Sequence, residues 1–181
     1  MEFYDVIRDR YSCKRFDGTK PSREKLGQIL EAGRLAPTAK NLQEQHIYVL
    51  ESNEALDTFD KVSPCRYGAP LVLVVAFDST NTYVYPGGKR NSGVEDVSIV
   101  ATHMLLAARN LGVDSCWVNR LDPDVLASEL GLPENEVVLM RRRAPRRCPT
   151  TARESPSQRP SRTCRTTHPL GLVKLACIQG G

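Results

Sequence analysis

The chain has 181 residues, and 25 Lys and Arg residues against 21 Asp and Glu residues give it a formal net charge of +4. That charge is unevenly distributed, because residues 1–140 carry 15 basic and 20 acidic residues, whereas residues 141–181 carry nine Arg and one Lys against a single acid. The basic character belongs to the last part of the chain alone, which excludes a uniformly basic nucleic-acid-binding domain.

The totals favour one globular domain with a packed core, since 40% of the residues are hydrophobic. No apolar run approaches the roughly 20 residues of a membrane helix, and no basic segment followed by an apolar one suggests a signal peptide. The six Cys residues form no C-x-x-C pair and only three His accompany them, so we expect no metal site. Reduced thiols in the cytoplasm are the simplest interpretation.

The first elements are helical. A short helix is predicted at residues 2–9, and a turn is expected at Asp17-Gly18. Ser22 can cap a second helix, because its hydroxyl accepts hydrogen bonds from the N–H groups of the first turn. That helix must end near Ala36, because Pro37 disfavours helical geometry at the residue before it.

The middle of the chain alternates between strands and a helix. A strand is predicted at 46–50 and a short helix at 53–61. Residues 71–77 are all apolar, which is typical of a central strand covered on both faces. Residues 79–93 form a long loop rich in Gly, Asn and Ser, and loops of this length in a compact domain are often functional.

The next helix, at 95–111, has little polar face and should lie in the core or in a subunit interface. A short strand is predicted at 116–118. Either Asp122 or Asp124 should cap the helix that follows, which reaches about residue 130. A further buried strand is predicted at 137–140.

Residues 141–181 contain no Phe, Tyr or Trp and are dominated by Arg, Pro, Ser, Thr and Cys. A buried strand that runs directly into three Arg residues is a conflict that folded sequences avoid. The segment could be a disordered basic arm, could bind nucleic acid or acidic lipid, or could be an out-of-frame translation. We favour the last and expect two parts, an incomplete folded domain at 1–140 and a foreign tail at 141–181.

The first candidate binding motif combines cations with a hydroxyl. Arg10, Ser12, Lys14 and Phe16 share one face if the segment is extended. Arg can grip phosphate oxygens with two hydrogen bonds, and Lys adds a point charge, so the motif suits a phosphate. An exposed basic segment that binds no ligand would show the same pattern of residues.

The second candidate motif is the loop that ends the helix before Pro37. Small residues let a backbone approach a flat ring, and amide side chains offer donors and acceptors to a heterocycle edge. The residues concerned are Pro37, Thr38, Ala39, Asn41 and Gln43. The alternative is an ordinary helix-terminating loop.

Few other side chains suggest chemistry. Cys65 next to Arg66 could be a reactive thiol, although a structural or incidental cysteine is the simpler interpretation. No nucleophile, base and acid combine into a convincing catalytic triad.

In this order and spacing, the two motifs resemble the nitroreductase family of FMN-dependent oxidoreductases, over about residues 2–140. Weaker points of similarity follow along the chain, at Ala69-Pro70, Gly93-x-Glu95-Asp96, Leu111-Gly112, Cys116-Trp117-Val118 and Leu130-Gly131-Leu132-Pro133. The resemblance implies an α+β fold, with a central mixed or antiparallel sheet flanked by helices. It also implies a homodimer with FMN at the subunit interface.

On this resemblance, Arg10, Ser12 and Lys14 hold the FMN phosphate and ribityl chain, with Tyr11 beside them. The loop with Pro37, Thr38, Ala39, Asn41 and Gln43 meets the flavin from the partner subunit. The segment Trp117-Val118-Asn119-Arg120 matches the family stretch that lines the ring, and the resemblance makes Trp117, Val118 and Asn119 binding residues. These side chains bind the cofactor, and the flavin carries the chemistry.

The implied activity is hydride transfer from NAD(P)H through flavin N5 to nitroaromatic, quinone or similar acceptors, by a ping-pong mechanism. Alternatives are another flavin reaction, such as reductive dehalogenation, and an inactive or impaired FMN-binding protein. Nucleic-acid binding through the tail is a weaker alternative. The family's pattern is not recognisable after Met140, so we expect lower stability and weaker FMN binding than in an in-frame relative.

Overall fold

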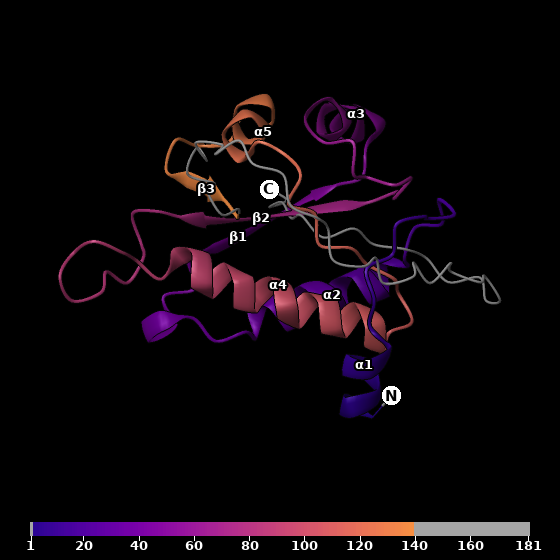
Figure 1. Ribbon diagram of the computed structural model, residues 1–181, viewed down its shortest axis with the longest axis horizontal. Coiled ribbons are helices and arrows are strands. Elements are labelled where there is room, and N and C mark those ends of the chain that lie inside the picture. The colour runs from indigo at the N-terminus through magenta and orange to yellow at the C-terminus, as the bar shows by residue number, and fades with distance from the viewer. Residues whose placement is uncertain (1, 140–181) are drawn as a thin grey trace, which may run out of the picture.

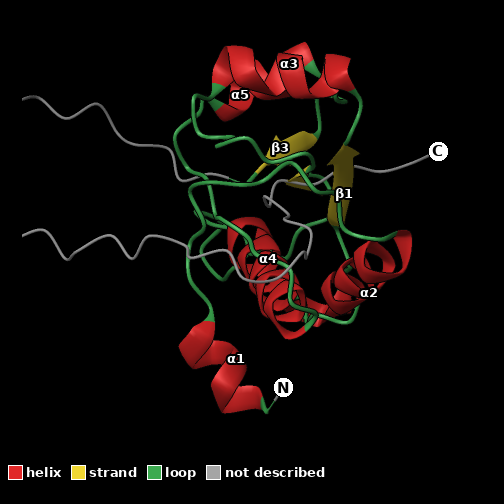
Figure 2. Cartoon of the chain, turned by 90° about the vertical axis from the view of Figure 1, so that its right-hand side faces the viewer, coloured by secondary structure: helices red, strands yellow, loops and turns green. Residues whose placement is uncertain are grey.

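Three antiparallel strands form the central sheet of the computed structural model, which describes residues 2–139 (Figure 1). The strands are β1 (Gln45–Leu50), β2 (Val72–Asp78) and β3 (Glu136–Val138), in the order β1-β2-β3. Along β1 and β2 the register runs from Gln45 opposite Phe77 to Leu50 opposite Val72. Helices cover both faces of this sheet, so the α+β class expected from the sequence is confirmed (Figure 2).

The central strand β2 is buried on both faces, as its apolar run predicts. Alternate side chains of a strand point to opposite faces of the sheet. Leu73, Val75 and Phe77 accordingly pack in the larger core, and Val72 and Val74 pack in the smaller one. One strand therefore anchors two hydrophobic cores.

The larger core lies beneath helices α2 (Arg23–Arg34) and α4 (Gly93–Asn110). Ser22 caps α2 as predicted, since its Oγ accepts a hydrogen bond from the Lys25 N–H at 3.2 Å. Helix α4 begins two residues earlier than the sequence suggests. Its buried residues include Val97, Val100 and Met104.

The smaller core lies beneath helices α3 (Asn53–Val62) and α5 (Pro123–Glu129) on the other face of the sheet. Asp122 is the cap of α5, because its Oδ1 accepts hydrogen bonds from the N–H groups of Asp124 and Val125 at 3.0 and 3.2 Å. Of the two predicted caps, the structure therefore selects Asp122.

Two helices each expose more than one large apolar side chain, whereas α5 exposes Val125 alone. The first is α1 (Phe3–Asp9), which lies below the body of the molecule at the end of α4 (Figures 1 and 2). The second is α4 itself. The exposed fractions are 63% for Phe3, 82% for Tyr4, 46% for Ile7, 40% for Val94 and 38% for Ile99. Such residues are costly to leave in water when they gather, and they mark surfaces that another protein can cover.

The prediction of a strand at 116–118 is wrong. After α4 the chain runs beside the N-terminal segment, but the only backbone bridge joining the two in the described residues is between Ser12 and Ser115. Ser115 and Trp117 each take part in a single isolated bridge, which is too little for a ladder, so no strand is formed at 116–118. The predicted tail at 141–181 lies outside the described residues. None of the helices at 2–139 has both the length and the apolar character needed to cross a bilayer.

Candidate functional site

A cavity of about 540 Å³ opens beside the extended segment that follows α1. Three stretches of chain meet there, and none of the residues they contribute is acidic. The lining residues are Ser12, Lys14, Cys65, Tyr67, Cys116, Trp117, Val118, Asn119 and Arg120. A cavity of this size matches those that hold small molecules and cofactors, which span roughly 300–1,000 Å³.

Backbone contacts set the orientation of the cationic stretch. The Cys13 N–H donates a hydrogen bond of 3.0 Å to the carbonyl of Ser115, which ties the segment to the residues after α4. Cys13 is fully buried, in a small cluster with Phe16, Ala69 and Cys116. Since side chains alternate along an extended segment, burial of Cys13 turns its two neighbours, Ser12 and Lys14, outward to the cavity.

The cavity is electropositive. The basic side chains of Lys14 and Arg120 both line it. A hydrogen bond with the Cys65 thiol, together with burial, raises the pKa of Tyr67 to about 12, so its phenol stays neutral. Two cations and the Ser12 hydroxyl suit the oxygens of a phosphate monoester, and the Trp117 side chain offers a flat wall to a ring. The donor set therefore fits FMN.

The structure gathers five of the twelve predicted binding residues in this cavity: Ser12, Lys14, Trp117, Val118 and Asn119. Two neighbours in the first motif do not line it. Arg10, the C-cap of α1, does not line the cavity. Phe16 is buried with Cys13, so the predicted common face of the even-numbered residues is limited to Ser12 and Lys14. The hydroxyl of Tyr11 donates to Asp114 Oδ2 at 2.6 Å, and neither residue lines the cavity.

Three further lining residues, Cys65, Tyr67 and Arg120, received no binding role from the sequence. Arg120 is the last residue of the stretch that lines the ring in the resemblance, but its side chain was not among the predicted binding residues. Cys65 and Tyr67 could not have been predicted to line the cavity, because nothing near them in the sequence indicates that their turn meets residues 116–120.

The second motif forms a tight loop. Lys40, Asn41 and Gln43 have φ values of 53, 55 and 53°, a left-handed conformation that costs non-glycine residues free energy. Side chains within the loop compensate, since Thr38 Oγ1 accepts from the Gln43 N–H at 3.0 Å and Gln43 Nε2 donates to Asn41 Oδ1 at 2.9 Å. Pro37 and Asn41 are exposed, so the loop presents a small ring and an amide to its surroundings.

This loop lies at the opposite end of α4 from the cavity. The Ala39 N–H donates to Asp96 Oδ1 at 2.8 Å, in the first turn of α4, whereas the cavity forms beyond the last turn. At about 1.5 Å per residue, a helix of 18 residues separates its two ends by roughly 27 Å. None of the residues from Pro37 to Gln43 lines the cavity. One chain thus holds the two predicted halves of the site far apart.

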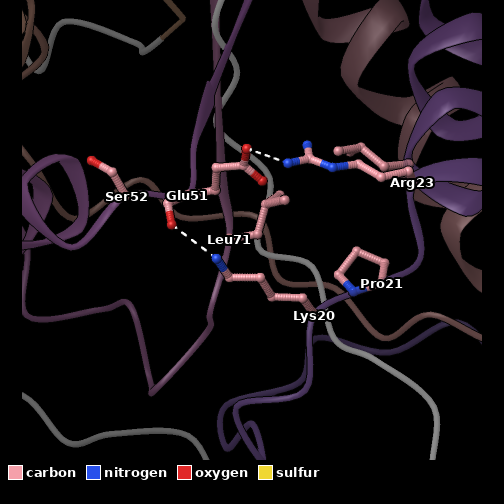
Figure 3. A pocket seen from close by; sticks show the side chains of 7 residues that line it. Lys20, Pro21, Arg23, Glu51, Ser52 and Leu71 are labelled. Carbon is pink, nitrogen blue, oxygen red and sulfur yellow. Dashed lines mark hydrogen bonds and ion pairs between the residues drawn. The ribbon is translucent and has the colours of Figure 1, made fainter.

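A second cavity, of about 290 Å³, lies between the start of α2 and the end of β1 (Figure 3). It too has two cations, but both are engaged by one residue. Lys20 Nζ donates to the Glu51 carbonyl at 3.0 Å, and Arg23 pairs with the Glu51 carboxylate at 2.7 Å. The positive charge here is already neutralised in part, so this cavity is the weaker anion site.

Comparison with known proteins gives consistent matches. The sequence model of the nitroreductase family matches residues 7–65 and 63–141. A protein of Methanothermobacter thermautotrophicus named "Putative NADH dehydrogenase/NAD(P)H nitroreductase" is 30% identical over 122 residues, which are 65% of this chain and 60% of that protein. The chain therefore spans less than two thirds of that relative's length.

Solved structures agree with the family match. A nitroreductase family protein of Clostridium difficile 630 is 34% identical with a TM-score of 0.74, over 77% of this chain and 80% of that one. A nitroreductase of Bacteroides fragilis NCTC 9343, solved with bound FMN, is 25% identical with a TM-score of 0.63, over 77% of this chain and 84% of its own. Sequence, fold and motif order agree, and the chain belongs to the nitroreductase family.

Proposed function

We propose that this chain is an FMN-dependent oxidoreductase of the cytoplasm that works as a homodimer and transfers electrons from NAD(P)H to nitroaromatic, quinone or similar acceptors. One observation supports this most strongly: an electropositive cavity and an amide-bearing loop lie at opposite ends of α4, in the motif order of the family. When bound, FMN supplies the hydride and electron transfer.

In this proposal each cavity residue has a binding role. Lys14 and Arg120 neutralise the phosphate, and the Ser12 hydroxyl donates a hydrogen bond to it. Trp117 to Asn119 lie along the edge of the ring, where their backbone N–H groups can donate. The indole N–H of Trp117 donates to Asn119 Oδ1 at 2.7 Å, which holds the indole against its own segment.

The separation of the two half-sites supports the proposed homodimer. A cavity from one copy and the 36–43 loop from a second copy can meet when two α4 helices lie antiparallel, and twofold symmetry then creates two equal sites. The exposed apolar residues of α1 and α4 would be covered in such an interface.

The function is tested by purifying the full chain and recording its flavin spectrum. We expect bound FMN whose visible absorbance bleaches anaerobically when NADPH or NADH is added and returns with a quinone or a nitroaromatic compound. A preparation that does not bind added FMN would contradict the proposal. The two nicotinamides added separately also show which one the protein prefers.

The dimer is tested at Ile99, which is 38% exposed on α4. Replacing Ile99 with Glu places a charge in the proposed interface and should weaken dimerisation by about 100-fold, with FMN released in parallel. Light scattering and flavin fluorescence over a dilution series measure both. Gln28→Glu, on the exposed side of α2, is the matched control and should change neither. A variant that remains a flavin-loaded dimer would exclude this interface.

A second candidate is a protein that binds FMN with little turnover. The observation that favours it is the family match, which ends at residue 141 of a chain of 181 residues. Flavin that stays oxidised under anaerobic NADPH and NADH, in an otherwise loaded dimer, would support this candidate over the first.

A further inference from the structure

Two acidic side chains lie buried beneath the 36–43 loop. Glu44 directly follows the loop and is 1% exposed, and Asp96 in the first turn of α4 is 4% exposed. The Glu44 carbonyl also accepts a hydrogen bond from the Asp78 N–H at 3.0 Å, which holds the start of β1 against the end of β2. The two carboxyl groups thus occupy the point where the loop, the sheet and α4 converge.

These carboxyl groups have too few donors around them to be charged together. Asp96 Oδ1 accepts from the Ala39 N–H, but Asp96 Oδ2 and the carboxyl oxygens of Glu44 receive no well-formed hydrogen bond from another N–H or O–H group within the described residues. The backbone N–H of Glu44 itself favours the charged form of its carboxyl group, but it is outweighed. Burial, and then a hydrogen bond with Asp96, raise the pKa of Glu44 to about 7. Two adjacent carboxyl groups in such a setting retain one proton between them, because two like charges there repel each other.

On the loop side, the nearest charged groups have other partners. Glu95, beside Asp96 in sequence, accepts a hydrogen bond from the Tyr85 hydroxyl and is exposed. The Lys40 ammonium lies 4.7 Å from the centroid of the Tyr83 ring. Glu95 therefore adds no positive charge, and Lys40 is engaged with the Tyr83 ring instead of with the carboxyl pair.

On the sheet side, too, the charged groups have other partners. The Asp78 carboxylate accepts from the Thr80 hydroxyl at 2.6 Å and from Asn135 Nδ2 at 2.9 Å. His46 pairs with Glu136. A proton, rather than a neighbouring cation, is therefore what can join Glu44 to Asp96.

We propose that Glu44 and Asp96 share one proton, and that this hydrogen-bonded pair is a positioning element that holds the 36–43 loop in its flavin-binding conformation. The inference rests on the proposed FMN function. With the proton present, Glu44 donates to Asp96 Oδ2 and leaves Oδ1 to receive the Ala39 N–H. With the proton lost, two buried carboxylates repel each other, and Asp96 in the first turn of α4 no longer holds the strained loop in place through the Ala39 N–H.

The test is the pH dependence of FMN binding to the full chain, measured by fluorescence titration from pH 6 to pH 9. We expect the affinity of the wild-type chain to fall roughly tenfold as the pH rises through 7, relative to Glu44→Gln. The Gln amide donates to Asp96 at every pH, so this variant should lack that transition. Dividing the two dissociation constants at each pH cancels the ionisation of the FMN phosphate itself, which has a second pKa near 6.

Two further variants sharpen the result. Asp96→Asn can still accept from the Ala39 N–H and can donate to Glu44, so it should also remove the transition. Glu95→Gln changes the exposed neighbour and should retain the wild-type profile. A wild-type profile that parallels that of Glu44→Gln would overturn the shared proton.

A flavin-independent measurement separates this inference from the proposed function. The melting temperature of the apo chain should fall between about pH 5 and pH 7 in the wild type, relative to Glu44→Gln, because a raised carboxyl pKa stabilises the fold only while the proton is bound. If FMN binds at no pH, the proposed function and the loop's flavin role both fail, and these melting curves alone decide on the shared proton.

Discussion

Replacing Lys14 and Arg120 together with Ala is expected to weaken FMN binding about 100-fold, through loss of two charge-assisted contacts to the phosphate. Both side chains line the cavity, and no acidic residue in its lining offsets their charge. Both side chains lie at the cavity and neither belongs to a hydrophobic core cluster, so the effect should fall on binding rather than on stability. Fluorescence titration of the apo chain with FMN measures it.

Riboflavin separates a phosphate contact from a general loss of the site. It has the same ring and ribityl chain but no phosphate, so the double variant should bind riboflavin within about twofold of the wild type. Lys20→Ala is the matched control, because Lys20 lines the other cavity and donates to the Glu51 carbonyl. Equal losses for FMN and riboflavin would contradict the assignment of Lys14 and Arg120 to the phosphate.

The largest effect on stability is expected at Gly93, the first residue of α4. A Cβ there would overlap the ring of Phe77, which is 3% exposed and packed in the larger core. Because core rings cannot move aside without displacing their neighbours, Gly93→Ala should destabilise the fold by about 2–3 kcal/mol. For a protein of this size that lowers Tm by roughly 5–10 °C.

Gly27 in α2 provides the opposite control. No heavy atom lies within 4 Å of a Cβ built there, and the residue is exposed in the interior of a helix. Gly27→Ala should therefore raise stability by about 0.5–1 kcal/mol. Thermal unfolding of the two variants should shift in opposite directions. If Gly93→Ala is as stable as the wild type, the contact between α4 and β2 is looser than the structure indicates.

Local signals in the sequence predicted most of the fold. Ser22 and Asp122 cap their helices because the interaction spans only two or three residues. The run at 71–77 identified β2, since a strand covered on both faces carries little polarity and seven residues are too few for a typical buried helix. The strand predicted at 116–118 was wrong because the prediction used local signals alone. An apolar segment becomes a strand only when a partner strand lies along its length.

The candidate site was less predictable. Ser12 and Lys14 were found because a short motif carries them, whereas the place of Arg120 depends on how distant segments meet. The bond between Ala39 and Asp96 spans 57 positions of sequence, and the burial of Glu44 depends on the same contact. Long-range contacts of this kind leave no local pattern, so the carboxyl pair became visible only in the folded chain.

The separation of the two half-sites along α4 has a genetic consequence. In the proposed dimer, each flavin site takes its cavity from one copy and its loop from the other. A copy with a damaged cavity and a copy with a damaged loop would therefore assemble one intact site and one doubly defective site. Two inactive alleles of this protein could complement each other in a mixed dimer and restore up to half of the activity, although neither copy functions alone.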